Sequence, residues 1–431
     1  MVDRCGNMPE AVDASARPVA AGRGEPARHW PKGIVFAAIL FAVTFALNLS
    51  DYMSRYVVVA LFGDLQREWS LSNAQLGALV SVVATAVGFL AIPVALLSER
   101  IGKARSLALM ALLWSAATWV SAHAQNYEQL LGSRVVVGIG EAAYSSVGLA
   151  LLLAYFPSSM RASVSGAFLA SGPLGQMLGI YAGSRIAADH GWRTAFLAMA
   201  ALGLGLALLF LLIARQTGAG ERRVDQPRFA VVVREIATKR TVAFAMFGSG
   251  LQLFAFAGFL AWAPTWLQSA YALSSLDAAK GAAILVLIGT LGMPLCSILA
   301  DRLALRHAHG RAHAAMLFCI VTAVSFAVGF LIDPGLAQLL LIGCGVFAGG
   351  AAVGPASAIF AQHLRPAIHG IAFSCGTVAN NLIGQGPSPW LIGKLADSFS
   401  LPFALSLSSA ASFMACILFF LSASERREKC N

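Results

Sequence analysis

Two opposite charges lie inside one long apolar stretch, residues 130–156. The stretch is long enough to cross a bilayer, which takes about 20 mostly apolar residues, yet it contains Arg134 and Glu141. Seven residues are two helical turns, so both side chains project from nearly the same face, about 10 Å apart along the axis. A charge facing lipid costs at least about 2.5–3.5 kcal/mol. We therefore expect both to face an interior, either in a proton or solute pathway or as a buried structural ion pair.

A second charged pair, Asp51 and Arg55, lies one turn apart on one face of the apolar stretch 34–62. Burial favours the neutral form of a carboxyl and a nearby Arg favours the charged form, so such an acid can bind and release protons. We predict that Asp51 and Glu141 form the protonatable pair of a transport site, with Arg55 and Arg134 as their partners. Two structural salt bridges between helices are the alternative.

Composition places these charges in a membrane protein. The chain has 431 residues, of which 58% are hydrophobic and 12% charged, and its mean hydropathy is +0.74. Soluble domains are near 25% charged. The net charge is +10, but the basic residues lie in short loops and tails, so we expect no nucleic-acid partner. The seven cysteines lack metal-type spacing, and no Walker A, nucleophile-elbow or HExxH sequence occurs. We therefore expect no cofactor, no metal and no enzymatic activity.

The apolar segments predict an all-α polytopic membrane protein with twelve transmembrane helices. One long polar connector, residues 215–240, divides them six and six. We predict a disordered tail 1–32, an N-terminal bundle 33–214, a linker 215–240, a C-terminal bundle 241–422 and a tail 423–431. The twelve segments are 34–62, 75–97, 104–122, 130–156, 162–187, 193–214, 242–271, 278–300, 313–332, 336–362, 368–395 and 401–422.

The basic residues predict the orientation. In a twelve-span topology, 23 of the 30 Lys and Arg residues fall in tails and loops on one side of the membrane. Cytoplasmic loops carry such an excess of Lys and Arg. We therefore predict that both termini are cytoplasmic, in an inner or plasma membrane.

The two halves also look duplicated. Glu99-Arg100 follows the second segment and Asp301-Arg302 follows the eighth, 202 residues later. Arg161 and Arg365 open the fifth and eleventh segments, 204 residues apart. Two six-helix repeats around a site at the bilayer midplane, rocking against each other, are typical of secondary transporters.

The loop between the second and third segments resembles the signature of a known transporter superfamily. Residues 95–105, ALLSERIGKAR, resemble the G-x-x-x-D-R-x-G-R-R signature of the major facilitator superfamily, with Ala95 for the Gly and Glu99 for the Asp. This resemblance implies two pseudo-symmetric six-helix bundles and a charged latch that holds one conformational state. We assign the latch to Glu99, Arg100, Lys103, Arg105, Asp301 and Arg302.

Within that superfamily the chain most resembles the Spinster family. The matching stretches include residues 48–56, 138–145, 156–161, 172–179, 191–196, 256–264 and 384–389. The resemblance implies a carrier of lysophospholipids, sphingoid lipids or related amphiphiles, with proton coupling. Where Spinster proteins carry an acid this chain has Ser54, so Asp51, one turn earlier, is our candidate to replace it.

The remaining candidate residues describe a cavity and a hinge. The C-terminal half has few polar residues in its apolar segments: Gln252, Asn380, Asn381, Gln385 and Lys394. A charged N-terminal half facing an apolar C-terminal half would form an amphipathic cavity. We expect Tyr52, Tyr144, Phe254, Trp262, Asn381 and Gln385 to line it. For the aromatic residues in the segment 242–271, core packing or an interfacial belt is the alternative. The Gly/Pro-rich segment around Gly172, Pro173 and Gly175 predicts a helix hinge, with close helix packing as the alternative.

The sequence thus predicts a monomeric, proton-coupled secondary transporter of a lysolipid or other amphiphile, working among membrane lipids by alternating access. One alternative is an organic-anion transporter, with Arg55, Arg134 or Lys394 holding a carboxylate. A more remote one is a non-transporting sensor on a transporter scaffold.

Overall fold

The computed structural model describes residues 33–214, 234–236, 238–307, 309–365 and 368–424. Its described residues are helical, with short turns between the helices and no strand among them. Three predicted segments lie wholly or mostly outside the described residues: the tail 1–32, the linker 215–240 and the tail 423–431. The predictions for those segments therefore stay predictions.

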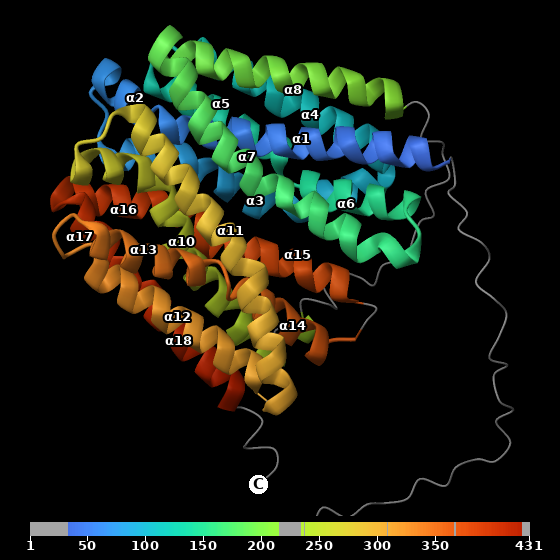
Figure 1. Ribbon diagram of the computed structural model, residues 1–431. Helices are drawn as coiled ribbons and strands as arrows, with labels where there is room; N and C mark the ends of the chain where they lie inside the picture. Colours follow the sequence, from blue (N-terminus) through green and yellow to red (C-terminus); the bar gives the residue numbers. More distant parts are fainter. Residues whose placement is uncertain (1–32, 215–233, 237, 308, 366–367, 425–431) are drawn as a thin grey trace, which may run out of the picture.

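The helices form two bundles that lie side by side, one from each half of the chain (Figure 1). The N-terminal bundle comprises α1 (Ile34–Ala60), α2 (Phe62–Trp69), α3 (Asn73–Ile101), α4 (Lys103–Ala122), α5 (Tyr127–Glu141), α6 (Tyr144–Tyr155), α7 (Arg161–His190) and α8 (Trp192–Ala214). The C-terminal bundle comprises α10 (Arg240–Tyr271), α11 (Ser275–Arg306), α12 (Gly310–Gly329), α13 (Leu336–Gly349), α14 (Val353–His363), α15 (His369–Ala379), η3 (Asn380–Gln385), α16 (Pro387–Ser398), α17 (Leu401–Leu407) and α18 (Ser409–Ser424).

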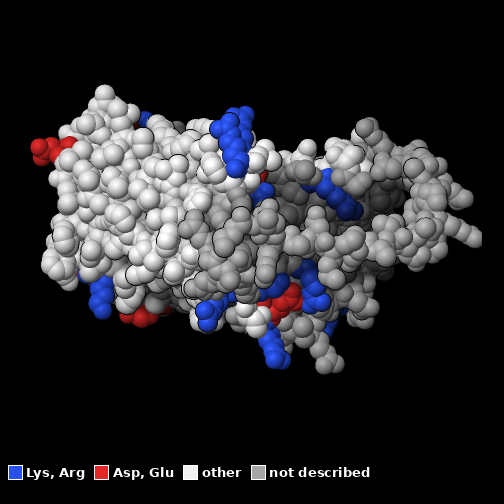
Figure 2. Space-filling view, turned by 90° about the horizontal axis from the view of Figure 1, so that it is seen from below, with Lys and Arg blue, Asp and Glu red and all other residues white. Residues whose placement is uncertain are grey.

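Nine helical runs within the described residues are long and apolar enough to cross a membrane. Three further runs, α4, α7 and α15 to α16, pack beside them and contain more small or polar residues. Together they account for the twelve predicted helices. Many Leu, Ile, Val and Phe side chains are exposed along the bundles, and Figure 2 shows one largely uncharged face whose few charged side chains lie mostly near its margins. Such a surface suits contact with lipid tails.

Several predicted segments are interrupted. The stretch 130–156 breaks at Ala142 and Ala143, directly after Glu141, so that α5 ends and α6 begins there. The stretch 336–362 breaks between α13 and α14, and 368–395 contains the π-helical turn η3. The π turn inserts an extra residue into a helix and is frequent at functional sites. The short helix α2 was not predicted.

The predicted hinge lies in a continuous helix. Helix α7 runs from Arg161 to His190 with Pro173 inside it, and Gly172 and Gly175 face α1. A Cβ atom at Gly175 would lie 2.3 Å from the carbonyl oxygen of Leu49, and one at Gly172 would lie 3.1 Å from the Tyr52 ring. These glycines therefore allow α1 and α7 to approach closely. A hinge role for Gly172, Pro173 and Gly175 stays a prediction.

Candidate functional site

A cavity of about 540 Å³ lies between the two bundles. Helices α1, α3, α5, α6 and α7 line it from one half, and α15 and η3 line it from the other. Polar and charged groups lie at one part of its wall, whereas Leu149, Leu169 and Phe373 lie toward the end at which α7 and α15 begin. The lining residues are Asp51, Tyr52, Arg55, Val87, Ala91, Glu141, Ala142, Ala143, Ser145, Ser146, Leu149, Leu169, Phe373, Ser374, Thr377, Asn380, Asn381 and Gln385.

The tertiary structure brings the charges of α1 and α5 together. The Arg55 Nη1 atom lies 3.7 Å from Oε2 of Glu141, and the two side chains are only 8% and 2% exposed. The carboxyl groups of Asp51 and Glu141 lie close enough to influence each other electrostatically. Oδ1 of Asp51 and both carboxyl oxygens of Glu141 are buried without a hydrogen-bond partner among the described residues. A proton held between the two carboxyls would supply one bond and reduce their repulsion.

Arg134, in contrast, is not among the residues that line the cavity. Its side chain is fully buried, and its guanidinium donates hydrogen bonds to the backbone oxygens of Ser54 (3.0 Å), Arg55 and Leu79 (3.4 Å). It therefore links α5 to α1 and α3, with its donors committed to backbone carbonyls. Its predicted contribution to the substrate site stays a prediction.

Three aromatic residues predicted to line the cavity are not among its lining residues. Tyr144 is fully buried and packs edge-to-face on Trp114, with ring centroids 4.8 Å apart. Trp262 is also fully buried; its Nε1 donates to the Pro389 oxygen at 3.0 Å and its ring lies 5.2 Å from that of Phe62. Phe254 is the third. For Tyr144 and Trp262 the structure favours core packing, the alternative for an apolar aromatic residue, whereas Phe254 is half-buried. Tyr52 does line the cavity, as predicted.

The π-helical turn η3 presents neutral polar groups to the cavity. Asn380, Asn381 and Gln385 all line it. Oδ1 of Asn380 accepts a hydrogen bond from Ser249 at 3.0 Å, and Nδ2 of Asn381 donates to the Thr377 oxygen at 3.0 Å. Oδ1 of Asn381 is buried without a hydrogen-bond partner among the described residues.

Some lining residues were not predicted as site residues. Ser145 and Ser146 on α6 and Thr377 on α15 line the cavity. Ser145 donates to Oδ1 of Asn48 at 3.0 Å, and Asn48 in turn donates to Ser171 at 2.7 Å. These hydroxyl groups lie one or two helical turns from Glu141 or Asn381. That spacing in the sequence could have indicated them as lining residues.

At the end opposite to the apolar part of the cavity, the two halves of the molecule contact each other and close it. The carboxylate of Asp397, on α16, accepts hydrogen bonds from the backbone N–H groups of Asn73 and Ala74 at the start of α3, at 2.8 and 2.9 Å. The backbone N–H of Trp390 donates to Ser81 at 3.0 Å. Close approach of α3 to α16 requires Gly77, since a Cβ there would lie 2.2 Å from the Pro389 oxygen.

The predicted latch residues form ion pairs within each half. Glu99 and Lys103 lie 3.8 Å apart, and Asp301 accepts from Nη2 of Arg311 at 3.0 Å. Arg311 was not among the predicted latch residues. Glu99 and Asp301 each pair with a cation on the helix that follows, so neither of these pairs joins the two bundles. Arg100, Arg105 and Arg302 are exposed.

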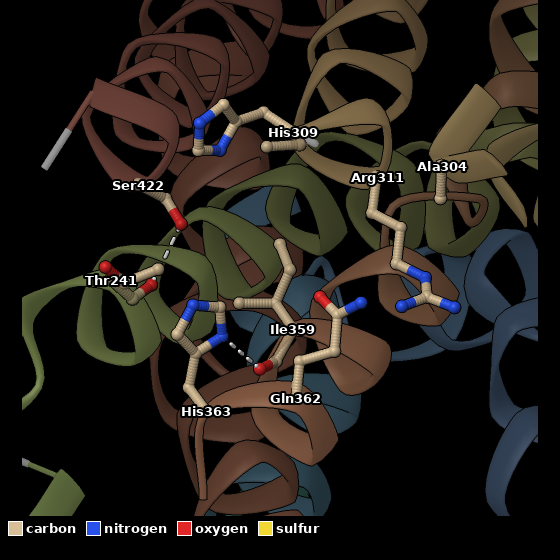
Figure 3. A pocket seen from close by; sticks show the side chains of 9 residues that line it. Thr241, Ala304, His309, Arg311, Ile359, Gln362, His363 and Ser422 are labelled. Atoms are coloured by element: carbon tan, nitrogen blue, oxygen red, sulfur yellow. Dashed lines mark hydrogen bonds between the residues drawn. The ribbon is translucent and has the colours of Figure 1, made fainter. Parts of the chain in front are cut away.

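A second, smaller hollow of about 50 Å³ lies where α10, α11, α12, α14 and α18 meet near their ends (Figure 3). His363 Nδ1 lies 2.8 Å from the Ile359 oxygen, and Ser422 donates to the Thr241 oxygen at 2.9 Å. Space of this size suits one or a few water molecules rather than an amphiphile. The cavity between the bundles is therefore the candidate transport site.

Two six-helix bundles around a central, partly polar cavity define a secondary transporter. The chain belongs to the Major Facilitator Superfamily, whose family model matches residues 44–389. Members of this superfamily are transporters and not enzymes, so the predicted fold class and the predicted general function are confirmed.

Within the superfamily the chain is similar to Spinster proteins. It is 25% identical over 398 residues to protein spinster homolog 1 of Xenopus tropicalis, covering 86% of this chain and 75% of that protein. It is 27% identical over 389 residues to the sphingosine-1-phosphate transporter SPNS2 of Danio rerio, covering 83% and 76%. A bacterial homolog of the human lysosomal transporter Spinster, solved in an inward-facing, unoccupied conformation, has the same fold, with a TM-score of 0.80 at 18% identity, covering 91% of this chain and 98% of that one.

Proposed function

We propose that this protein carries a single-chain amphiphile, a lysolipid or a similar molecule, by alternating access coupled to protons. The observation that carries the proposal is the composition of the cavity between the bundles. Its wall joins a buried acid pair, Asp51 and Glu141, to the apolar side chains Leu149, Leu169 and Phe373. A polar headgroup and an apolar chain would each find a matching surface. The similarity to a sphingosine-1-phosphate transporter supports a lipid substrate.

Proton coupling rests on the two carboxyl groups. Two carboxylates in contact repel each other, and burial adds a cost for each charge. We expect the pair to hold one proton when the cavity is empty, with Arg55 facing Glu141 at 3.7 Å. The solvation of this pair would differ between the inward-facing and the outward-facing state. The pair would then bind the proton in one state and release it in the other, so that the proton moves in the same direction as the substrate or in the opposite one.

The proposed state is inward-facing. The apolar part of the cavity lies toward the end at which α7 and α15 begin, near Arg161 and Arg365. Basic residues mark the cytoplasmic side of a membrane protein. On this basis both termini are cytoplasmic, in an inner or plasma membrane. Each half supplies the other's interface at the closed end, which fits a monomer as the transporting unit.

An organic-anion substrate finds less support in the site. That alternative requires Arg55, Arg134 or Lys394 to hold a carboxylate. Arg134 donates to backbone oxygens, and Lys394 is exposed on α16 with its Nζ 5.3 Å from the centre of the Trp390 ring. Of these three, Arg55 lines the cavity, and it faces Glu141.

The test is proton flux in proteoliposomes loaded with a pH-sensitive dye. Lysophospholipid should elicit proton movement that is lost in Asp51→Asn and in Glu141→Gln, both present at normal levels in the membrane. The matched control is Glu128→Gln, an exposed acid in the first turn of α5. Proton movement with small carboxylates alone would contradict the proposal, and binding without any flux would favour a sensor. Full activity in both acid variants would remove these acids from the coupling mechanism.

A further inference from the structure

We infer that an anionic phospholipid of the surrounding bilayer binds at the end of α11, with its phosphate group at Arg302 and Arg311. This second site shares no lining residue with the cavity between the bundles. The inference therefore goes beyond the proposed function, and it concerns a lipid that stays bound to the outside of the bundle.

The site is an open hollow of about 450 Å³ where the end of α11, the start of α12 and the end of α14 meet. Arg311 from α12 and Gln362 from α14 lie beside Ala304 of α11 (Figure 3). The same three residues also line the smaller hollow of about 50 Å³, so the two spaces adjoin. The lining residues of the open hollow are Ile298, Asp301, Arg302, Ala304, Leu305, Arg311 and Gln362.

An exposed apolar stripe on α11 leads to this hollow. Leu291, Leu295 and Ile298 are 51%, 54% and 53% exposed, and their spacing of four and three residues puts them on one face of the helix. Arg302 follows on the same face, four residues and about 6 Å beyond Ile298. An acyl chain lying along the stripe would therefore bring its phosphate group to the level of Arg302.

The charges of the hollow match one phosphate group. Arg302 is exposed and takes part in no ion pair within the described part of the chain. Arg311 donates from Nε and Nη2 to Oδ1 of Asp301, at 3.2 and 3.0 Å, which uses only some of its five N–H donors. Two arginines and one aspartate leave an excess of one positive charge, and a phosphodiester carries one negative charge.

The adjoining hollow does not oppose an anion. Its described lining residues include His309, His363 and Arg311 but no acid. Nε2 of His363 is buried without a hydrogen-bond partner among the described residues, while its Nδ1 lies against the Ile359 oxygen. Because a carbonyl oxygen only accepts, Nδ1 carries a proton, and a protonated ring would direct a second N–H group into this space.

The excess positive charge distinguishes between lipid headgroups. Phosphatidylglycerol has a net negative charge, whereas phosphatidylethanolamine and phosphatidylcholine add a cation to the same phosphate. That cation would enter a hollow that already has a positive excess. In the proposed orientation this end of α11 is cytoplasmic, and basic pockets between helices on that side bind anionic headgroups. A free phosphate ester would meet the same arginines but would leave the apolar stripe unused.

The experiment measures the Kd of the most tightly bound lipid on the purified full-length protein by native mass spectrometry. It compares phosphatidylglycerol, phosphatidylethanolamine and phosphatidylcholine with identical acyl chains. We expect the Kd of phosphatidylglycerol to be at least about fivefold lower than the other two, since one basic residue near an anionic headgroup contributes about that factor. Glycerol phosphate, which lacks acyl chains, should not compete at the same concentration.

Three variants place the lipid on the structure. Arg302→Gln should raise the Kd of phosphatidylglycerol about fivefold, whereas Arg302→Lys should keep it within about twofold. The matched control is Arg306→Gln, because Arg306 is an exposed arginine one turn further along α11 that does not line the hollow. It removes the same charge and should leave the Kd within about twofold.

The comparison of the three lipids needs no variant. Equal or tighter binding of a zwitterionic lipid would overturn the inference. Equal losses in Arg302→Gln and Arg306→Gln would also overturn it, because they would indicate general attraction by surface charge. Competition by glycerol phosphate at the concentration of the lipid would show a site for a free phosphate ester and contradict the lipid assignment. None of these readouts uses flux, so the proposed function is tested separately.

Discussion

The Asp397 carboxylate accepts a hydrogen bond from the backbone N–H of Asn73, 324 residues away, at 2.8 Å. Its second oxygen accepts from the next N–H, that of Ala74, at 2.9 Å. The unpaired N–H groups at the first turn of a helix favour a negative charge. An acid of the C-terminal half thus caps the start of α3 in the N-terminal half, and the cap exists only while this end of the transporter is closed.

Replacing this cap should open the closed end more often. Loss of a capping side chain costs about 0.5–2 kcal/mol, so Asp397→Ala should shift the ratio of open to closed molecules by about 2- to 30-fold. Distances between spin labels on α2 and α17 would report the change. The control is Asp277→Ala, because Asp277 accepts hydrogen bonds from Ser274 and Lys280 within its own half. An unchanged distance distribution in Asp397→Ala would show that the cap does not hold this state.

Arg134→Lys should reduce stability without changing substrate affinity. A lysine ammonium cannot reproduce the planar guanidinium that contacts carbonyls on two helices, so at least one buried oxygen loses its donor, at a cost of about 1–3 kcal/mol. The melting temperature of the purified protein should fall, whereas the half-saturation concentration for lysolipid should stay within about twofold. The exposed Arg67 on α2 offers a matched Arg67→Lys control. A large change in half-saturation with unchanged melting would return Arg134 to the substrate site.

Gly175→Ala should separate α1 from α7. The added Cβ would lie 2.3 Å from the Leu49 oxygen, so the helices must shift, at a cost of about 1–3 kcal/mol. We expect a lower melting temperature and slower transport. Gly166 lies on the same helix, and a Cβ atom added there would have no neighbouring atom within 4 Å among the described residues, so Gly166→Ala should be neutral or stabilising. Equal effects of the two substitutions would mean that the close packing has no role.

Glu68 should make stability depend on pH in the acid range. Hydrogen bonds from Arg193, followed by one from Trp192, lower the pKa of the Glu68 carboxyl below its usual 4.5. A carboxyl with a lowered pKa in the folded state contributes stability at higher pH, and that contribution disappears as the pH falls through the folded-state pKa. Because both charged side chains are more than a third exposed, we expect an effect of only about 0.5–1 kcal/mol.

The measurement for Glu68 compares the melting temperature of the unchanged protein with that of Glu68→Gln from pH 3 to pH 8. The difference should be present at neutral pH and should shrink as the pH falls below the usual carboxyl pKa of 4.5. Glu128→Gln, at an exposed position of α5, serves as the control. A difference that stays constant over the whole range would mean that the charge of Glu68 is not responsible.

The sequence alone determined that Arg55, Asp51, Arg134 and Glu141 avoid lipid. The cost of a charge in hydrocarbon is the same whatever the tertiary fold, and apolar segment lengths likewise fix the number of spans. The two halves were also predictable, because the repeated Glu99-Arg100 and Asp301-Arg302 pairs follow corresponding segments.

Only the tertiary structure decided which buried charge faces the cavity. Arg55 and Arg134 are chemically alike, but the Arg134 side chain reaches carbonyls of α1 and α3, whereas Arg55 reaches Glu141. The π turn at Asn380–Gln385 and the cap from Asp397 to α3 also depend on neighbours far away in the chain. Helical periodicity gives the relative directions of side chains on one helix, but the rotation of that helix against its partners is set by packing, and packing assigns each face to the core, the lipid or the cavity.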